Sequence, residues 1–307
     1  MRTVVFACMF ASASVSAAPS IIGFDASRGG QGSLNAGSMT GLRTAIQAAY
    51  PGIPIDGVST LSAANMQGHS VAFLGSGTAG QSAITPLSAA EQAALSSFVL
   101  AGNGALIFSD NDTFAGAASQ PANLSLLAPW GMTSTGTGAP WERFSNVINF
   151  NTSPVTDGPF GTVTSHSVGW SGWFNTLGSA TVLGRLADNA QPSLAVIPRG
   201  VLGPGSGAVV LFSDLTWTVD GFLNAAGKKL VLNALAFVAG PGCVGDLNSD
   251  GFVDDADFSL FAGAYNVLDC AEPAMPAGCP ADLNHDGFVD DADFVIFIGA
   301  YNELVCS

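Results

Sequence analysis

A duplicated segment near the end of the chain restricts its fold more than any other feature. Residues 246–266 read DLNSDGFVDDADFSLFAGAYN and residues 282–302 read DLNHDGFVDDADFVIFIGAYN, so 17 of 21 positions are identical. The copies lie 36 residues apart, and four cysteines keep the same interval. The sequence therefore predicts two copies of one small structural unit.

Each copy opens with the spacing of a calcium-binding loop. Asp, Asn and Asp occupy positions 1, 3 and 5, Gly follows at position 6, and Asp returns at positions 9 and 12. Calcium takes oxygen ligands at about 2.3–2.6 Å, which a tight loop of this pattern supplies, with position 7 contributing a backbone carbonyl. We therefore predict two Ca²⁺ ions. The predicted ligands are Asp246, Asn248, Asp250, Phe252, Asp254 and Asp257 in the first loop, and Asp282, Asn284, Asp286, Phe288, Asp290 and Asp293 in the second.

The residues around each loop predict a loop–helix unit. Phe258, Phe261 and Tyr265 follow the first loop at helical spacing, and the second copy repeats the pattern. Pro and Gly precede both loops and disfavour the leading helix of an EF-hand. Position 12 is also Asp, in place of the Glu of an ordinary EF-hand loop.

Two such units joined by a Pro-containing linker resemble the dockerin family, and the resemblance covers residues 243–307. Dockerins are non-catalytic modules that bind two calcium ions and dock onto a cohesin domain of a scaffold or cell surface, often tethering polysaccharide-degrading enzymes. The resemblance implies a small all-α module with a cohesin-like partner. Contacts at loop positions 10 and 11 would fall on Asp255, Ala256, Asp291 and Ala292, where family members often carry Ser-Thr.

Charge sets the same segment apart. It holds thirteen of the 23 acidic residues and none of the eight Lys and Arg. This balance argues against nucleic acid as a partner and favours a bound cation or a basic protein surface. The alternatives are a metal-free acidic spacer and a calcium-binding stalk repeat without a partner. Uncompensated repulsion argues against the first, and the apolar helices argue against the second.

Cysteine placement predicts two disulfides in this segment. Antiparallel packing of the two units brings Cys270 to Cys279 and Cys243 to Cys306, which is the pairing we favour. The competing pairing, of Cys243 with Cys270 and Cys279 with Cys306, spans a helix of about 10 residues, or roughly 15 Å. Disulfide-linked Cα atoms lie within about 7 Å.

The start of the chain predicts export. Residues 1–17 have a positive start, a short apolar stretch and a small-residue cleavage site, which is typical of a secretory signal peptide. The apolar stretch is shorter than the about 20 residues of a membrane-spanning helix, and no later segment is apolar enough to span. We therefore expect a secreted, extracellular protein.

Residues 18–240 alternate strand and helix patterns, which predicts an α/β domain with a mostly parallel sheet flanked by helices. Residues 143–198 are expected to form several further strands and hairpins. The expected strands are 21–24, 71–75, 105–110 and 207–215, and the expected helices are 38–50, 88–100, 123–128 and 219–238.

The segments LSAAEQAALSSFVLAGNGALIFSD and GAVVLFSDLTWTVDGFLNAAGKKLVLNALAFV resemble the class I glutamine-amidotransferase-like fold, an architecture of flavodoxin-like type. Active members carry a nucleophilic Cys on a strand-to-helix elbow. Residues 18–240 contain no Cys, so we expect amidotransferase chemistry to be absent.

Three carboxylates are the remaining candidates for chemistry in this domain. Asp110, Asp112 and Asp214 follow predicted strands, where open α/β sheets bind ligands. They form either a catalytic or metal-binding cluster or, as we favour, caps of turns and helices. His69 and His166 are the available bases, and each is more often a structural residue.

The five Trp residues allow two interpretations, since Trp packs in cores and also stacks on sugar rings. They are Trp130, Trp141, Trp170, Trp173 and Trp217. We thus expect a docked cargo domain without catalysis, which binds carbohydrate if these rings are exposed. The alternative is an extracellular hydrolase that cleaves the O-glycosyl bonds of a polysaccharide, which requires two carboxylates about 5–10 Å apart.

Overall fold

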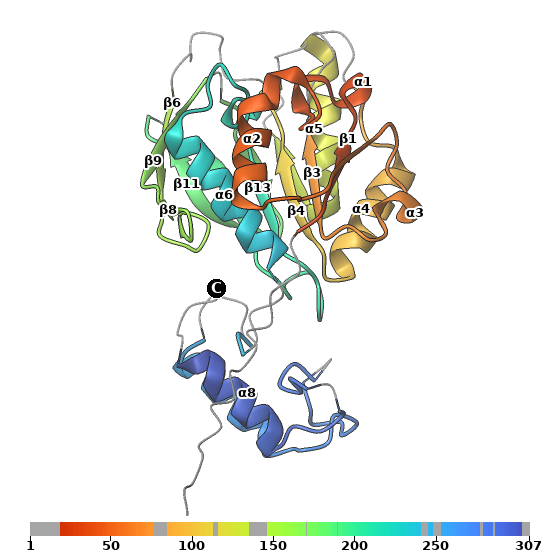
Figure 1. Ribbon diagram of the computed structural model, residues 1–307, viewed down its shortest axis with the longest axis vertical. Coiled ribbons are helices and arrows are strands. Elements are labelled where there is room, and N and C mark those ends of the chain that lie inside the picture. The colour runs from red at the N-terminus through yellow and green to blue at the C-terminus, as the bar shows by residue number, and fades with distance from the viewer. Residues whose placement is uncertain are drawn as a thin grey trace, which may run out of the picture.

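The computed structural model describes an α/β domain and a small helical module that each have their own core (Figure 1). The segment of residues 1–17, predicted as a signal peptide, lies outside the described residues. The structure describes residues 19–76, 85–112, 116–134, 146–169, 171–188, 190–240, 245–247, 253–276, 279–284 and 286–302.

A nine-stranded sheet forms the centre of the α/β domain, in the order β2-β1-β3-β4-β13-β12-β11-β6-β9. The first five of these strands are mutually parallel, and the other four join them by antiparallel pairing. The parallel strands are β1 (Ile21–Phe24), β2 (Ile55–Val58), β3 (Val71–Gly75), β4 (Gly104–Phe108) and β13 (Val209–Phe212). The antiparallel part comprises β6 (Asn146–Phe150), β9 (Ser165–Val168), β11 (Thr181–Leu186) and β12 (Pro192–Ile197).

Helices cover both faces of the sheet, as the continuous apolar strands predict (Figure 1). The helices α2 (Thr40–Ala49) and α6 (Ala225–Ala239) pack on one face, whose core contains Phe108 and Phe212. On the other face lie α3 (Ala63–Met66), α4 (Ala89–Leu100) and α5 (Ser119–Leu127), and α1 (Ala26–Gly29) follows β1. Two short antiparallel pairs complete the domain: β5 (Met132–Ser134) with β10 (Phe174–Leu177), and β7 (Asp157–Gly158) with β8 (Gly161–Thr162).

Most expected elements are present, with shifted ends that have local causes. The capping box of Ser88 and Glu91 starts α4 as predicted. The last helix begins at Ala225 instead of residue 219, because Asn224 caps it and a short 3-10 turn occupies Leu215–Trp217. Strand β2 has no sequence prediction, since its Asp and Gly interrupt the apolar pattern. The strands predicted at 105–110 and 207–215 end at 108 and 212, and the helix predicted at 123–128 begins at 119.

The C-terminal module contains two helices, α7 (Asp255–Tyr265) and α8 (Asp291–Tyr301). The Tyr265 hydroxyl donates to Asp291 Oδ1 at 2.6 Å, and the Tyr301 hydroxyl donates to Asp255. The end of each helix therefore meets the start of the other, so the helices are antiparallel. Phe261 and Phe297 stack between them with ring centroids 4.8 Å apart.

One predicted disulfide lies within the described residues. Cys270 and Cys279 are linked, with their Cα atoms 5.4 Å apart. The link joins the end of the first loop–helix unit to the start of the second, as the antiparallel arrangement requires. Cys243 and Cys306 lie outside the described residues.

Candidate functional site

The second predicted calcium loop is tightly closed by its own carboxylates. The backbone N–H of Asp286 donates to Asp282 Oδ1 at 3.1 Å and to Asn284 Oδ1 at 2.9 Å. Asp282 Oδ2 accepts from the N–H of Gly287 at 2.9 Å, and Gly287 has a φ of +93°. The turn at position 6 thus uses the conformational freedom of Gly, and positions 1, 3 and 5 converge on one side.

Asp293, at position 12, holds the two ends of this loop together. Its Oδ1 accepts from the N–H groups of Leu283 and Asn284 at 2.8 and 3.0 Å, and its Oδ2 accepts from Asp290 at 2.9 Å. The residue is completely buried. The shorter arm of Asp therefore lies inside the loop. Asp290, at position 9, caps α8 through a bond from the N–H of Ala292.

The first loop repeats this closure at its described residues. Asp257 accepts from the N–H groups of Leu247 at 2.7 Å and Asp254 at 3.0 Å, and it too is completely buried. Asp254 caps α7 as Asp290 caps α8. Asp246 is described at the start of this loop. The predicted ligands Asn248, Asp250 and Phe252 lie outside the described residues.

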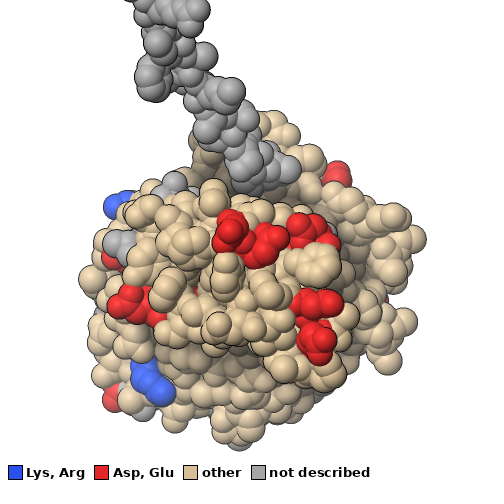
Figure 2. Space-filling view, turned by 90° about the horizontal axis from the view of Figure 1, so that it is seen from below, with Lys and Arg blue, Asp and Glu red and all other residues tan. Residues whose placement is uncertain are grey.

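A loop of this kind concentrates negative charge that no basic residue of the module compensates. Residues 243–307 contain no Lys or Arg. Figure 2 shows acidic side chains in several groups on one face, with few basic side chains towards one side. Carboxylate and amide oxygens are the ligands that Ca²⁺ prefers, so the chemistry of these residues fits the ion.

A second group of side chains near the loop does not offer a metal site. Cys270, Cys279 and Asp282 lie close enough together for their side chains to surround one ion. The two cysteines are joined in a disulfide, however, so neither provides a thiolate ligand. Asp282 belongs instead with the predicted calcium ligands.

In the α/β domain, Asp110 and Asp214 lie side by side at the carboxyl edge of the sheet. The register pairs Phe108 of β4 with Phe212 of β13, and each Asp follows two residues later. Asp110 is 6 % exposed and Asp214 is completely buried. Burial and repulsion from Asp214 raise the pKa of Asp110 well above its ordinary value, and burial raises the pKa of Asp214 to about 7. The pair therefore retains a proton at mildly acidic pH.

Asp112 joins this group through Asn123 of α5. The Asn123 amide donates to Asp112 Oδ1 at 2.7 Å and to the Asp110 carbonyl at 2.6 Å, while its oxygen accepts from the Asp110 N–H at 2.9 Å. Ser134 also donates to Asp112 Oδ1 at 2.7 Å. Asp214 Oδ1 caps the Leu215–Trp217 turn. The favoured interpretation of these residues as caps thus agrees with their contacts.

The backbone near Gly172 covers this pair of carboxyl groups. A Cβ atom at Gly172 would lie 2.7 Å from the Ser213 carbonyl oxygen and 3.0 Å from that of Asp110. The segment therefore packs directly on the ends of β4 and β13. A substrate reaches Asp110 and Asp214 only if this segment moves.

Neither histidine joins the carboxylates in a catalytic arrangement. His166 is buried against Trp217, with ring centroids 4.9 Å apart, and burial lowers its pKa to about 4. His69 precedes β3, at the opposite edge of the sheet, with Nε2 3.6 Å from Asp56 Oδ2.

The described Trp side chains serve the core more than a sugar-binding surface. Trp130 and Trp217 are buried, and Trp173 packs partly buried against the core. Trp141 and Trp170 lie outside the described residues. The predicted carbohydrate contact therefore has no exposed Trp pair among the described residues.

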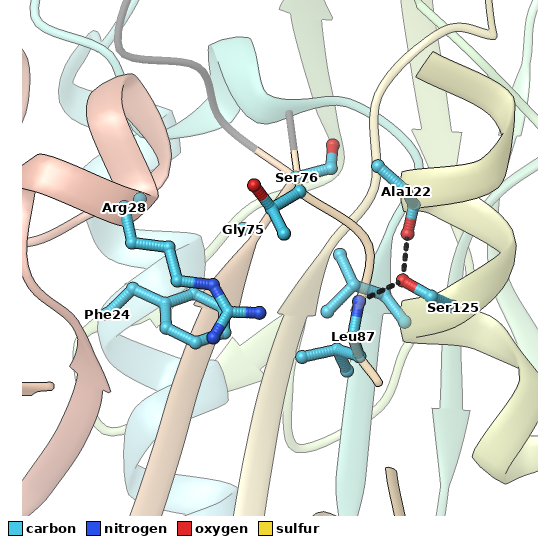
Figure 3. Close-up of a pocket in the computed structure, with 10 residues that line it drawn as sticks. Phe24, Arg28, Gly75, Ser76, Leu87, Ala122 and Ser125 are labelled. Carbon is cyan, nitrogen blue, oxygen red and sulfur yellow. Dashed lines mark hydrogen bonds between the residues drawn. The ribbon is translucent and has the colours of Figure 1, made fainter. Parts of the chain in front are cut away.

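The parallel strands follow the order 2-1-3-4-5 of flavodoxin-like folds, whose ligands bind where the chain reverses between β1 and β3. Figure 3 shows this place, where the Arg28 guanidinium lies over the Phe24 ring, 4.1 Å from its centroid. Arg28 also pairs with Glu91. Against the opposing effect of burial, hydrogen bonds from Arg28 and Ser88 lower the pKa of Glu91 to about 2.

These side chains fill the switch point. The cavity between Phe24, Ser76, Leu87 and Ser125 holds about 10 Å³, which is space for one water molecule at most. A larger cavity of about 350 Å³ opens between α3 and α4, at the amino edge of the strands, and includes Met66, His69 and Phe98. Within the described residues, the usual ligand position of this fold is therefore closed.

Comparison with known proteins identifies the fold of the α/β domain alone. No protein-family model and no curated protein sequence matches the chain. The structure titled "mmIFT52 N-terminal domain" is similar to 71 % of the chain and 97 % of its own length, with 12 % identity and a TM-score of 0.53. This likeness concerns the fold.

Two further solved structures have lower TM-scores, and we draw nothing from them. A putative GMP synthase subunit from Thermoplasma acidophilum shares 11 % identity and a TM-score of 0.47 over 72 % of this chain and 94 % of its own. A beta-galactosidase from Rahnella sp. R3 shares 14 % identity and a TM-score of 0.45 over 71 % of this chain and 31 % of its own.

Sequence patterns missed the two tyrosine contacts that join the helices of the module. Tyr265 and Tyr301 occupy position 20 of their repeats, and their acceptors Asp291 and Asp255 occupy position 10. Both positions are identical between the copies, which was the available signal. Pairing them required the antiparallel arrangement in three dimensions.

Proposed function

We propose that this is a secreted protein whose C-terminal module, residues 243–307, binds two Ca²⁺ ions and attaches the chain to a cohesin-bearing extracellular scaffold. The α/β domain is its non-catalytic cargo. The observation that carries the proposal is the matched closure of two loops by buried Asp257 and Asp293. The dockerin-like spacing of the loop residues supplies the rest.

Electrostatics supports bound calcium in both loops. The predicted ligands of the second loop are joined by hydrogen bonds within one short segment, and each carboxylate repels its neighbours. A divalent cation removes this repulsion, and the net gain is a calcium affinity. Extracellular modules of this type bind Ca²⁺ at about 10⁻⁴–10⁻³ M, and tighter loops reach about 10⁻⁷–10⁻⁵ M.

The arrangement of carboxylates in the α/β domain supports cargo over catalyst. A glycosidase needs one acid and one carboxylate on opposite sides of an accessible bond, roughly 5–10 Å apart. Asp110 and Asp214 are adjacent, buried and covered near Gly172. We therefore do not favour polysaccharide hydrolysis.

Calorimetric titration of the full chain with Ca²⁺ tests the proposal, with a chain ending at residue 240 as the control. The expected result is two sites in the full chain and none in the control. A calcium-loaded chain that binds a purified cohesin domain, and releases it on chelation, completes the test. A full chain that binds no calcium would remove the proposal.

A further inference from the structure

The four differences between the two repeats are unevenly placed, and this asymmetry concerns the outer surface of the module. Every described position that is buried in both copies is identical, including the loop-closing Asp and the stacked Phe. One difference falls in the loops, at residues 249 and 285, outside the described residues. The other three occupy one turn of each helix: Ser259, Leu260 and Ala262 in α7 are replaced by Val295, Ile296 and Ile298 in α8.

Val295 is the clearest case of an apolar side chain that the fold does not require. It is 72 % exposed, and the equivalent residue of α7 is an exposed Ser259. The surrounding helices are otherwise nearly identical, so the same fold accepts Ser at this place. A β-branched residue also has no helix-propensity advantage there. The requirement for Val295 therefore comes from outside the chain.

Its neighbours extend the exposed apolar surface on α8. Phe294 is 37 % exposed and Ile296 is 36 % exposed, so three consecutive apolar side chains face solvent. In α7 the corresponding run is interrupted by Ser259 between Phe258 and Leu260. A contiguous exposed apolar patch on a small module marks a contact surface.

Charge specifies what can cover this patch. Asp290 and Asp291 stand at the start of α8, and the module has thirteen acidic residues without a basic one. Two copies of such a surface repel each other, which excludes self-association as the favoured use. The complementary partner has an apolar patch with Lys or Arg around it.

The tyrosine contacts shift recognition further along the helix. Asp291 accepts the Tyr265 hydroxyl and Asp255 accepts that of Tyr301, so loop position 10 is used within the module in both copies. The differing side chains lie one turn later. Recognition by side chains that differ between the copies makes the two helices unequal as docking surfaces.

We propose that α8, through Val295 and its neighbours Phe294 and Ile296, is the docking helix, and that its partner is a protein surface with an apolar centre and a basic rim. This inference rests on the proposed function, because it names which half of the module meets the scaffold. The module then docks in a single orientation, although its two repeats are nearly identical in sequence.

The test uses the calcium-loaded full chain against a panel of purified, immobilised cohesin domains. Val295→Ser makes α8 like α7 at this position, and Ser259→Val is the matched control. We expect Val295→Ser to weaken binding at least about tenfold, while Ser259→Val changes it less than about twofold. Because Ser occupies this place in α7, the variant is expected to fold, and retention of two calcium sites verifies it.

The outcomes separate the two proposals. Equal effects of both substitutions, or a larger effect of Ser259→Val, would overturn the assignment of α8 while keeping the docking function. A wild-type chain that binds two calcium ions but no cohesin domain of the panel would refute the docking function and this inference with it. Reduced binding by a second α8 variant, Ile296→Ser, is the further expected result.

Discussion

The molecule buries Asp side chains in two regions, and the two regions treat them in opposite ways. Asp257 and Asp293 are completely buried in the C-terminal module, where backbone N–H groups donate to both carboxylate oxygens. Asp110 and Asp214 are buried beside each other in the α/β domain, and Asp214 has one oxygen without a partner among the described residues. Burial alone therefore does not determine the charge of an Asp.

The hydrogen-bond donors make the difference. A carboxylate that accepts several N–H bonds is stabilised in its ionised form, whereas two adjacent carboxyl groups in an apolar setting favour a retained proton. The first arrangement is suited to a cation, since the negative charge persists. The second suits a site that stays neutral, because charging it would place two repelling carboxylates side by side.

Removing calcium is expected to have the largest effect. Each site occupied at about 100 times its dissociation constant stabilises the folded module by about 2.7 kcal/mol. We predict that chelation together with disulfide reduction unfolds the module and leaves the α/β domain folded. NMR spectra of the full chain measure both regions at once. Module signals that stay dispersed after both treatments would argue against resident calcium.

Substitution of one loop-closing Asp sharpens the comparison. Asp293→Asn keeps the side-chain shape but removes the charge and one set of acceptor positions. We expect the calcium stoichiometry to fall from two to one and the module to lose about 1–3 kcal/mol. Calorimetry and chemical denaturation measure the two quantities. Asp257→Asn is the matched variant, and a loss in only one of the two would mean that the repeats are not equivalent in binding.

The opposite result is expected for the buried pair in the α/β domain. Asp214 has a folded-state pKa of about 7 against an ordinary value of 3.8, so the folded protein holds an extra proton between these values. The free energy of unfolding therefore falls as pH rises from about 4 to about 7. Asp214→Asn keeps the acceptor for the Thr216 N–H and removes this dependence.

We accordingly expect Asp214→Asn to stabilise the α/β domain at pH 8, on the order of 2 kcal/mol, and to leave it nearly unchanged at pH 4. Thermal unfolding from pH 4 to pH 8 measures the difference between variant and wild type. The charged groups that act on Asp110 are the acidic Asp112 and Asp214, and neither α5 nor the segment at Gly172 adds another. A difference that does not vary with pH would show that the pair is not proton-linked.

The smallest expected effect concerns the tyrosine contacts in the module. Tyr265→Phe removes an exposed hydrogen bond to Asp291 and leaves the ring in place. We predict a loss of about 0.5–1 kcal/mol, with calcium binding retained. Denaturation of the calcium-loaded chain measures it. Tyr301→Phe should match it, since its contact with Asp255 is the equivalent one.

The sequence predicts the module better than the α/β domain, and the reason is the range of the interactions. The closing of each loop involves residues about ten positions apart, so the spacing of Asp and Gly contains the information. The Cys270–Cys279 pairing followed from antiparallel packing of two repeats, and this pairing is confirmed. The paired Asp110 and Asp214 are 104 residues apart and meet only through the register of β4 and β13.

The extent of the parallel sheet also exceeded what local patterns predict. Buried strands such as β3 and β4 are recognisable from their apolar runs, but β2 is half-exposed and its Gly57 lies against Asp25. The antiparallel extension from β12 to β9 gives only alternating patterns, which fix no neighbour. Tertiary contacts decided both.

The Cys270–Cys279 bond has a consequence for survival among proteases. The residues between them, 271–278, are rich in Ala and Pro and connect the two loop–helix units. A cut at any peptide bond within this stretch leaves a nicked chain whose two halves remain covalently joined through sulfur. The C-terminal helix, and whatever it holds, would then stay attached to the cargo until the bond is reduced.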